Sequence, residues 1–254
     1  MATIIEKLRI ELEADPGFYF KGNGSRRFGN TLDTLLEHAP PPARLLDIGG
    51  DRSDYLKRKE GNRMPYSFGH YFRGAGYTYT SVNESDLDAR ADPLPFPDES
   101  FEVVTAWEII EHLWAQGGGG LAHWGGILHF WQEAHRVLEP GGLFFCATRN
   151  RWCPLAWHLM RQGKSGACYH AEVEGNELKP GHVREFTADE LVAISRATDT
   201  YPIQSTLSRS CLSTSMESQI GAIISPLEDF LGRTFRPEER HDSVYFLGRK
   251  AIGI

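Results

Sequence analysis

The 254-residue chain lacks the features that mark several large classes of protein. It has no uninterrupted apolar run near the length of about 20 residues that crosses a bilayer. Its first residues also lack the basic stretch followed by an apolar one that is usual in a secretory leader. We therefore expect a cytoplasmic protein without a membrane-spanning segment.

Cysteine is scarce, and its spacing excludes common metal and redox motifs. The four cysteines, Cys146, Cys153, Cys168 and Cys211, contain no C-x-x-C pair. Such pairs are the usual sign of zinc sites and dithiol centres. We interpret all four as free thiols in a reducing compartment.

The chain has no excess of positive charge. It carries 27 Lys and Arg residues against 34 Asp and Glu residues, a formal net charge of −7. Because a nucleic-acid backbone is bound through concentrated Lys and Arg, this balance disfavours nucleic acid as a partner. The net charge does not exclude a local basic patch.

One stretch combines a short apolar run with a turn of small residues. Residues 44–48 read Arg-Leu-Leu-Asp-Ile and lead into Gly49 and Gly50, with a helix start expected just beyond. A brief apolar run bounded by turn residues is typical of a buried parallel strand. Glycine at its exit lets the backbone approach a ligand, and a helix start supplies free N–H groups. The stretch predicts a ligand-binding strand–turn–helix unit.

Strand-like and helix-like segments alternate along the rest of the chain. Helices are expected at residues 4–13, 30–38, 127–138, 187–194 and 220–231. Strands are expected at residues 77–83, 101–106, 143–148, 203–207 and 244–248. Non-helical connections are expected at residues 22–29 and 139–142, with a polar region at 54–74 and a long connection without clear period at 149–183. This alternation predicts an α/β fold whose parallel sheet is covered by helices on both faces.

The carboxyl ends of the expected strands carry most of the candidate site residues, because ligands in such sheets bind beyond these ends. The ends carry Asp47 with Gly49 and Gly50, Asn83 with Glu84, Trp107 with Glu108, and Thr148 with Arg149. The turn after residue 48 contains neither the G-x-G-x-x-G dinucleotide motif nor a G-K-[ST] phosphate loop. The ligand is therefore not identified by either of these motifs.

Glycine and tryptophan gather in the middle of the chain. Residues 117–120 are four consecutive glycines, and all six tryptophans lie between Trp107 and Trp157. We expect a mobile loop beside a group of large aromatic side chains. Two interpretations stay open: core packing alone, or an apolar substrate pocket with a lid.

Four separated motifs resemble those of class I S-adenosylmethionine-dependent methyltransferases. They lie at residues 45–49 (Leu-Leu-Asp-Ile-Gly), 94–104, 108–113 (Glu-Ile-Ile-Glu-His-Leu) and 133–142, in the family's order and separation. Residues 182–187 further resemble family members that modify sugars and small metabolites. The resemblance implies a Rossmann-like, doubly wound, mostly parallel sheet with an antiparallel last strand and helices on both faces.

The same resemblance implies one methyltransferase domain over residues 1–254. Its expected parts are N-terminal helices (1–43), a cofactor-binding core (44–148), a substrate loop or insert (149–183) and the C-terminal part of the sheet (184–254). The implied cofactor is S-adenosyl-L-methionine, and the implied partner is a small-molecule acceptor. The oligomeric state, a homodimer included, stays open.

The family likeness assigns cofactor roles to the strand ends. Asp47 would orient the turn and reach the methionine amino group, directly or through water. The backbone of Gly49 and Gly50 would lie against the cofactor, and Asn83 or Glu84 would accept hydrogen bonds from the ribose hydroxyls.

Two further segments have implied contacts with the cofactor. Asp92, with Pro93 and Leu94, would meet the edge and face of the adenine. Trp107 would border both the methionine part and the substrate.

The turn departs from the family pattern at two positions. The family usually has three alternating glycines after the acid, whereas this chain has Gly49, Asp51 and Ser53. Asp51 would place negative charge near the cofactor carboxylate. Ser53 could cap the following helix, and a nearby arginine such as Arg52 could offset the charge. The alternative is a methyltransferase-like binding or scaffold protein that no longer catalyses.

Transfer of a methyl group to a hydroxyl needs a base that removes its proton. His112 is the first candidate because it follows the strand at 101–106 and imidazole titrates near neutral pH. Glu111 and His182 are alternatives, and a structural role for His112 stays open.

Glu108 with Glu111 and His112 also resembles a metal-binding set of small-RNA 2′-O-methyltransferases. Related non-metal enzymes share these residues, however, and we expect no metal. The resemblance thus implies O-methylation of a sugar or other small molecule, with N- or C-methylation still open.

Overall fold

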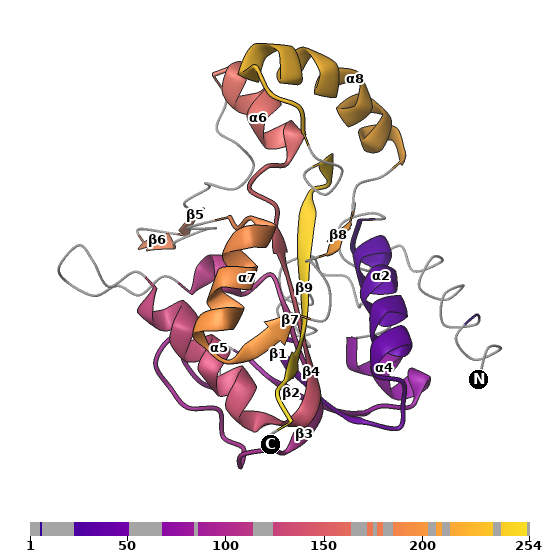
Figure 1. Cartoon of the computed structure of the whole chain (residues 1–254), viewed down its shortest axis with the longest axis vertical. Helices are drawn as coiled ribbons and strands as arrows, with labels where there is room; N and C mark the ends of the chain where they lie inside the picture. The colour runs from indigo at the N-terminus through magenta and orange to yellow at the C-terminus, as the bar shows by residue number, and fades with distance from the viewer. Residues whose placement is uncertain are drawn as a thin grey trace.

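The computed structural model describes residue 6 and residues 23–50, 68–83, 86–113, 124–163, 172–174, 177–179, 185–202, 207–209, 214–235 and 240–252. A seven-stranded sheet stands at its centre (Figure 1). Its strands are β1 (Arg44–Ile48), β2 (Thr78–Val82), β3 (Phe101–Trp107), β4 (Leu138–Arg149), β7 (Thr200–Pro202), β8 (Leu207–Arg209) and β9 (Ser243–Lys250). Their order is β2-β1-β3-β4-β9-β7, with β8 also paired to β9.

The strand directions confirm the expected fold class. β1 pairs in parallel with β2 and β3, and β3 pairs in parallel with β4. The last strand, β9, runs antiparallel to β4, β7 and β8. In β1 the four residues from Leu45 to Ile48 are all buried, as expected for a parallel strand covered on both faces.

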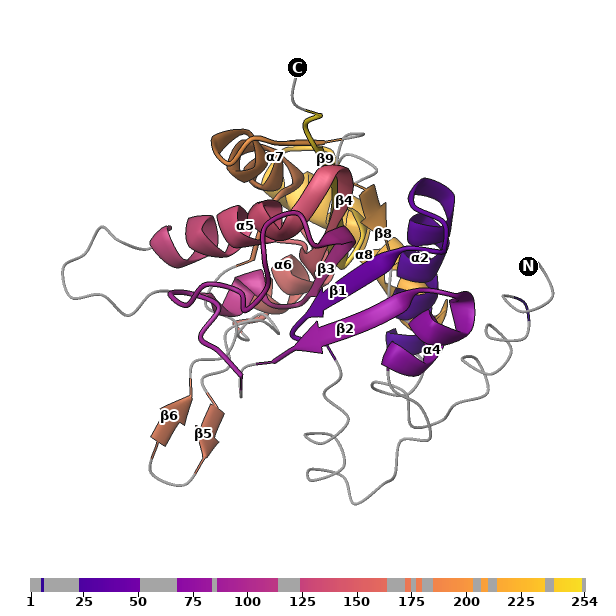
Figure 2. The same cartoon turned by 90° about the horizontal axis from the view of Figure 1, so that it is seen from below.

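Helices cover both faces of the sheet (Figure 2). One face carries α2 (Asn23–His38) and α4 (Phe68–Ala75), and the other carries α5 (Gly125–Val137) and α7 (Ala188–Ala197). Two apolar clusters follow from this arrangement. Leu32, Leu35 and Phe72 pack with Leu45 and Val103 on the first face. Ile127, Trp131, Leu191, Leu46 and Val104 belong to the cluster on the second.

The start of α7 follows the expected capping box. The hydroxyl of Thr187 accepts a hydrogen bond from the backbone N–H of Glu190 at 3.2 Å. The carboxylate of Glu190 accepts one from the backbone N–H of Thr187 at 2.9 Å. These reciprocal bonds satisfy two N–H groups that the first turn would leave unpaired.

Two expected connections are wrong. The described part of the expected loop 22–29 is helical, because α2 begins at Asn23. Packing of Leu32 and Leu35 against the sheet outweighs the weak helix propensity of the preceding Gly, Asn and Ser residues. The expected turn at 139–142 belongs to β4, which starts at Leu138. The pairing register of β3 and β4 shifts between Phe101 and Val103, and Gly141 adopts φ +78° in this irregular stretch.

The long connection after β4 contains regular structure. It holds α6 (Pro154–Arg161) and a small hairpin of β5 (Glu172–Glu174) and β6 (Glu177–Lys179). Helix α6 contacts α8 (Thr214–Leu231), and the two lie together beyond the end of β4 (Figure 1). Strand β7 ends at Pro202 and β8 begins at Leu207. Of the strand expected at 203–207, only Leu207 lies within the described residues. Apart from residue 6, the expected helix at 4–13 lies outside the described residues.

Candidate functional site at the carboxyl edge of the sheet

Three parallel strands end side by side and bring distant segments together. Ile48, the last residue of β1, pairs with Val82 of β2 and with Ala106 of β3. The segments after these strands therefore start from one edge of the sheet. As the alternation of strands and helices predicted, this edge carries Gly49, Asn83 and Trp107.

Asp47 is buried beneath this edge and is held by two hydroxyl groups. The residue is only 1% exposed. Oδ1 accepts a hydrogen bond from Thr105 at 2.8 Å, and Oδ2 accepts one from the Tyr79 hydroxyl at 2.9 Å. The carboxylate thus links β1 to both neighbouring strands, and its position favours a role in orienting the turn that follows.

The turn after β1 is too closely packed for side chains at Gly49 and Gly50. Gly49 adopts φ +72°, and its N–H donates to the carbonyl of Val82 at 2.7 Å. A Cβ at Gly49 would lie 2.3 Å from Cδ1 of Ile109, and one at Gly50 would lie 1.9 Å from Oδ2 of Asp47. Glycine is therefore required at both positions, and the turn offers only its backbone.

The loop between β2 and β3 places Asp92 and Leu94 in different environments. Asp92 is exposed, and its Oδ2 accepts a hydrogen bond from the backbone N–H of Asp88 at 2.8 Å. Leu94 is 4% exposed and belongs to the core, while its N–H donates to the carboxylate of Glu133 at 2.7 Å. Pro93 between them is exposed. At the end of β2, the N–H of Asn83 donates to the carboxylate of Asp86 at 2.8 Å.

Trp107 ends β3 on the face that α2 and α4 cover. Its ring centroid lies 5.2 Å from that of Phe68 and 6.1 Å from that of Phe145. The side chain is half-buried and packs against the cluster that also contains Leu45 and Val103. Trp107 and Asp47 therefore face the same side of the sheet.

The residue after Trp107 is held in an unusual backbone conformation by a chain of charges. Glu108 adopts φ +48°, and its N–H donates to the carbonyl of Ala147 at 2.8 Å. Its carboxylate lies 3.4 Å from Nε of Arg149, whose Nη1 lies 3.6 Å from Asp242. The Glu108 and Asp242 side chains are only 13% and 4% exposed, so these ion pairs fix the segment that places Ile109 over Gly49.

Glu111 and His112 follow in a short 3-10 helix, η1 (Ile110–His112). Glu111 is 1% exposed, and its Oε2 accepts a hydrogen bond from the Thr148 hydroxyl at 2.9 Å. Its buried Oε1 takes no hydrogen bond from the described residues. Burial, followed by the neighbouring Glu108 carboxylate, raises the pKa of Glu111 to about 8. Glu111 is therefore largely protonated at neutral pH. The neighbouring His112 is half-buried.

A family model described as a methyltransferase domain matches residues 20–204 of the chain. The chain belongs to this family. The match includes every candidate site residue, from Asp47 to His182.

Individual relatives match shorter parts of this methyltransferase-family chain. A protein of Mycolicibacterium smegmatis, named a probable S-adenosylmethionine-dependent methyltransferase, is 34% identical over 101 residues, or 40% of this chain and 29% of the relative. A protein of Mycobacterium tuberculosis with the same kind of name is 31% identical over 108 residues, or 42% and 30%. The matched segment thus spans about three-tenths of the length of these relatives. Among solved structures, a chain from the complex between the Haloferax volcanii Trm112 methyltransferase activator and a methyltransferase has a TM-score of 0.48 and 14% identity, with 99% of each chain covered.

Four candidate residues of the methyltransferase-family chain lie outside the described residues. They are Asp51, Ser53, Glu84 and His182. The departure from the three-glycine pattern and one candidate base therefore remain sequence predictions. In the described part of the chain, no group of three or more His, Cys, Asp or Glu side chains could hold a metal ion. None of the helices in that part is long and apolar enough to cross a membrane.

The residues that hold the predicted site in place were not predicted from the sequence. Thr105 and Tyr79 bond Asp47, and Ile109 covers Gly49. The available signal was positional and held only for Thr105, which is a polar residue in the largely apolar β3. Tyr79 lies among the Thr and Ser residues of β2 and does not stand out there. Thr105 lies directly beside Asp47 because of the pairing register of β1 and β3. This register cannot be predicted from the sequence of either strand alone.

Proposed function

We propose that this chain is an S-adenosylmethionine-dependent methyltransferase that transfers the methyl group to an oxygen of a sugar or another small molecule. The turn after β1 carries the cofactor part of this proposal: a buried Asp47 lies directly under Gly50, at the edge where three parallel strands end. The names of the two mycobacterial relatives include the same cofactor. The acceptor class rests on the sequence resemblance of residues 182–187 to sugar- and metabolite-modifying members.

The described residues fit this cofactor. Gly49 and Gly50 carry no side chains, so the turn presents only backbone atoms to the cofactor. Near the expected adenine position, the N–H of Asp92 donates to Asp88 and that of Leu94 donates to Glu133, while Pro93 has none. The exposed Asp92 carboxylate therefore becomes the polar group for the adenine amine, because its Oδ1 takes no hydrogen bond from the described residues.

The remaining cofactor contacts are assigned by position. Asn83, with Glu84, would bind the ribose hydroxyls beyond β2. Trp107 would border the methionine part and the acceptor beyond β3. Asp47 would orient the turn through its bonds to Tyr79 and Thr105, and it would reach the methionine amino group, directly or through water. Asp51 and Ser53 would lie at the carboxylate end of the cofactor.

In the reaction, the chain mainly positions two ligands and removes one proton. When bound, S-adenosylmethionine supplies a methyl group that its sulfonium already activates. The protein then holds the acceptor oxygen in line and excludes water. His112 is the proposed base, with His182 as the other histidine candidate. Glu111 suits a structural hydrogen bond better, because it is protonated near neutral pH and bonded to Thr148.

Calorimetric titration with S-adenosylhomocysteine tests the cofactor part. We expect saturable binding, and no heat at millimolar ligand would contradict it. Asp92→Asn should weaken binding about tenfold or more, because a hydrogen bond to a charged group contributes roughly 1.5–3 kcal/mol. The matched control is Asp229→Asn, which changes an exposed carboxylate on α8 and should leave the affinity unchanged.

Turnover separates the enzyme from its alternative. The wild-type chain is incubated with S-adenosylmethionine and a panel of hydroxylated sugars, and S-adenosylhomocysteine release is measured. The proposal predicts release that depends on an acceptor and falls in His112→Ala. Cofactor binding without release on any acceptor would favour the binding or scaffold function suggested by Asp51 and Ser53.

A further inference from the structure

Three polar side chains form a stripe along one face of α5. His129, Glu133 and Arg136 are separated by four and three residues, so they lie on one side of the helix. Nε2 of His129 lies 3.1 Å from the carbonyl oxygen of Asp92, which it can bond in the tautomer protonated at Nε2. The stripe faces the loop that connects β2 to β3.

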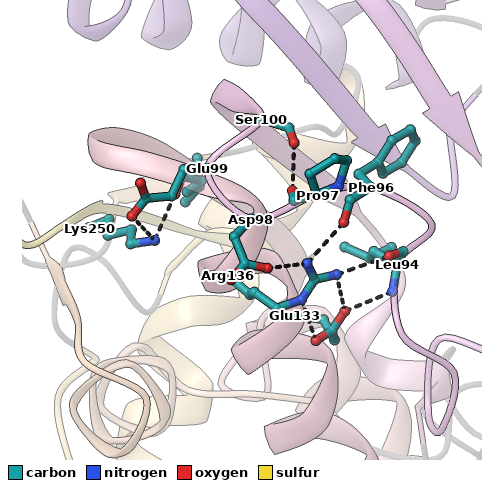
Figure 3. A network of polar contacts seen from close by, with 10 residues as sticks. Leu94, Phe96, Pro97, Asp98, Glu99, Ser100, Glu133, Arg136 and Lys250 are labelled. Atoms are coloured by element: carbon teal, nitrogen blue, oxygen red, sulfur yellow. Dashed lines mark hydrogen bonds and ion pairs between the residues drawn. The ribbon is translucent and has the colours of Figure 1, made fainter.

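Glu133 and Arg136 form hydrogen bonds with the backbone of the same loop (Figure 3). Oε2 of Glu133 accepts from the N–H of Leu94 at 2.7 Å. Nη2 of Arg136 donates to the carbonyl of Leu94, and Nη1 donates to that of Phe96, both at 2.9 Å. Nη1 also contacts the carboxylate of Asp98 at 2.7 Å. One helix face thus bonds the backbone of residues 92, 94 and 96.

Glu133 and Arg136 also bind each other. Nε and Nη2 of Arg136 donate to the two carboxylate oxygens of Glu133 at 2.9 and 2.8 Å. This is a two-pronged contact that only the planar guanidinium can make. The side chains are 14% (Glu133) and 29% (Arg136) exposed, so the pair is partly shielded from water. The hydrogen bond from Arg136 lowers the pKa of Glu133, which favours the charged form of this carboxylate.

The loop is held again just beyond these contacts. The N–H groups of Glu99 and Ser100 donate to the carbonyls of Arg136 and Val137 at 3.0 and 2.8 Å. Nζ of Lys250 lies 3.4 Å from the Glu99 carboxylate (Figure 3). It also donates to the carbonyl of Leu138 at 2.8 Å. The exposed Asp92 and Pro93 therefore precede a segment that is held at several points.

We propose that His129, Glu133 and Arg136 are positioning residues that hold Asp92 and Pro93 where adenine binds. The inference rests on the proposed function, because the place of adenine comes from it. These residues do not touch the ligand. They act by keeping the loop backbone in one conformation, so that the Asp92 carboxylate is presented without rearrangement.

The test compares ligand affinity in variants of the stripe. S-adenosylhomocysteine and 5′-methylthioadenosine are titrated into the wild-type chain, Arg136→Met, Arg136→Lys and Glu133→Gln. We expect Arg136→Met and Glu133→Gln to weaken both ligands by the same factor of about ten, which corresponds to ~1.4 kcal/mol. The factor is shared because both ligands carry the adenine that the loop meets. Arg136→Lys keeps the charge but not the fork, so it should restore only part of the affinity.

The matched control is Arg44→Met. Arg44 donates to Glu102 at 2.9 Å and also pairs with Glu139, but it stands at the start of β1, at the opposite edge of the sheet. This variant should lose a comparable surface ion-pair set and leave both affinities unchanged. Hydrogen exchange provides a ligand-free readout. The amides of Leu94, Phe96 and Asp98 should exchange faster in the stripe variants, and those of residues 44–48 should not.

The outcomes separate the two proposals. If the wild-type chain binds neither ligand, the proposed function fails and this inference fails with it. If the wild type binds while folded stripe variants keep their affinity, the positioning role is wrong and the proposed function stands. A loss in Arg44→Met equal to that in Arg136→Met would also overturn the positioning role. If Arg136→Met does not fold, Arg136→Lys and Glu133→Gln decide.

Discussion

At the turn after β1, one carboxylate and one glycine depend on each other. Asp47 is bonded to Thr105 and Tyr79 on either side, and its Oδ2 occupies the space into which a Cβ at Gly50 would point. The turn can approach a ligand closely only while this buried arrangement is intact. The same residues therefore determine local stability and the shape of the proposed cofactor site.

Gly50→Ala should damage both properties. The added methyl would lie 1.9 Å from Oδ2 of Asp47, so the carboxylate or the turn must move. Overpacking of this kind costs about 1–3 kcal/mol of unfolding free energy. Chemical denaturation measures this loss, and titration with S-adenosylhomocysteine should show weaker binding. Gly125→Ala is the control, because a Cβ at this first residue of α5 meets no atom within 4 Å. Equal stability of the two variants would contradict the packing argument.

Glu111 gives the protein a pH-dependent loss of stability. Its pKa is about 8 in the folded chain, against 4.5 for an ordinary glutamate. Between these values the unfolded chain releases a proton that the folded chain retains. The free energy of unfolding contributed by this group therefore falls as pH rises from about 4.5 to about 8, and is then constant.

Glu111→Gln should remove this loss, because the amide keeps the shape of the acid but cannot ionise. We expect the variant to match the wild type near the acidic end of this range and to be more stable at its alkaline end. Denaturation curves across the range provide the comparison. Parallel pH profiles for the two proteins would show that Glu111 does not hold its proton. Retained methyl transfer by the variant would also agree with a structural role.

At the scale of single elements, α7 offers the clearest link between sequence and stability. Its capping box joins Thr187 and Glu190 by two reciprocal hydrogen bonds. Thr187→Ala should lower the unfolding free energy by about 1 kcal/mol, as for other N-cap replacements. Thr187→Ser keeps the hydroxyl and should retain most of it. Thermal denaturation of both variants measures the difference, and an unchanged Thr187→Ala would mean that the cap is not needed.

Elements with a local signal were predictable from the sequence. The apolar run at Leu45–Ile48 gives a buried strand, the helical period from Ile127 gives α5, and the Thr187 box gives the start of α7. The beginnings of α2 and β4 were not predictable. Both depend on packing against a sheet that forms from distant segments, so Gly and Pro next to them were misleading.

The same distinction holds for the site. Asp47, Gly49 and Trp107 could be placed at the carboxyl edge because strand ends are visible in the sequence. Their supports could not, because Thr105 reaches Asp47 only through strand register, and Arg136 reaches Leu94 across 42 residues. The positions of the candidate site residues are thus easier to predict from this sequence than the contacts that hold them.

At the scale of the whole molecule, we propose that cofactor binding and acceptor binding use different parts of the chain. The sheet edge at β1, β2 and β3 carries the candidate cofactor residues, whereas α6 and α8 lie beyond the end of β4 (Figure 1). We propose that the chain acts as one domain over residues 1–254, with residues 44–148 binding the cofactor and 149–183 contributing to the acceptor side.

A crystal structure of the chain with S-adenosylhomocysteine tests the central claim most directly. The account predicts ligand density along the turn at Gly49 and Gly50, with the adenine amine at hydrogen-bonding distance from the Asp92 carboxylate. It also predicts that Asp47 keeps its bonds to Tyr79 and Thr105. Ligand density away from this edge, or adenine that does not approach residues 92–94, would contradict the account.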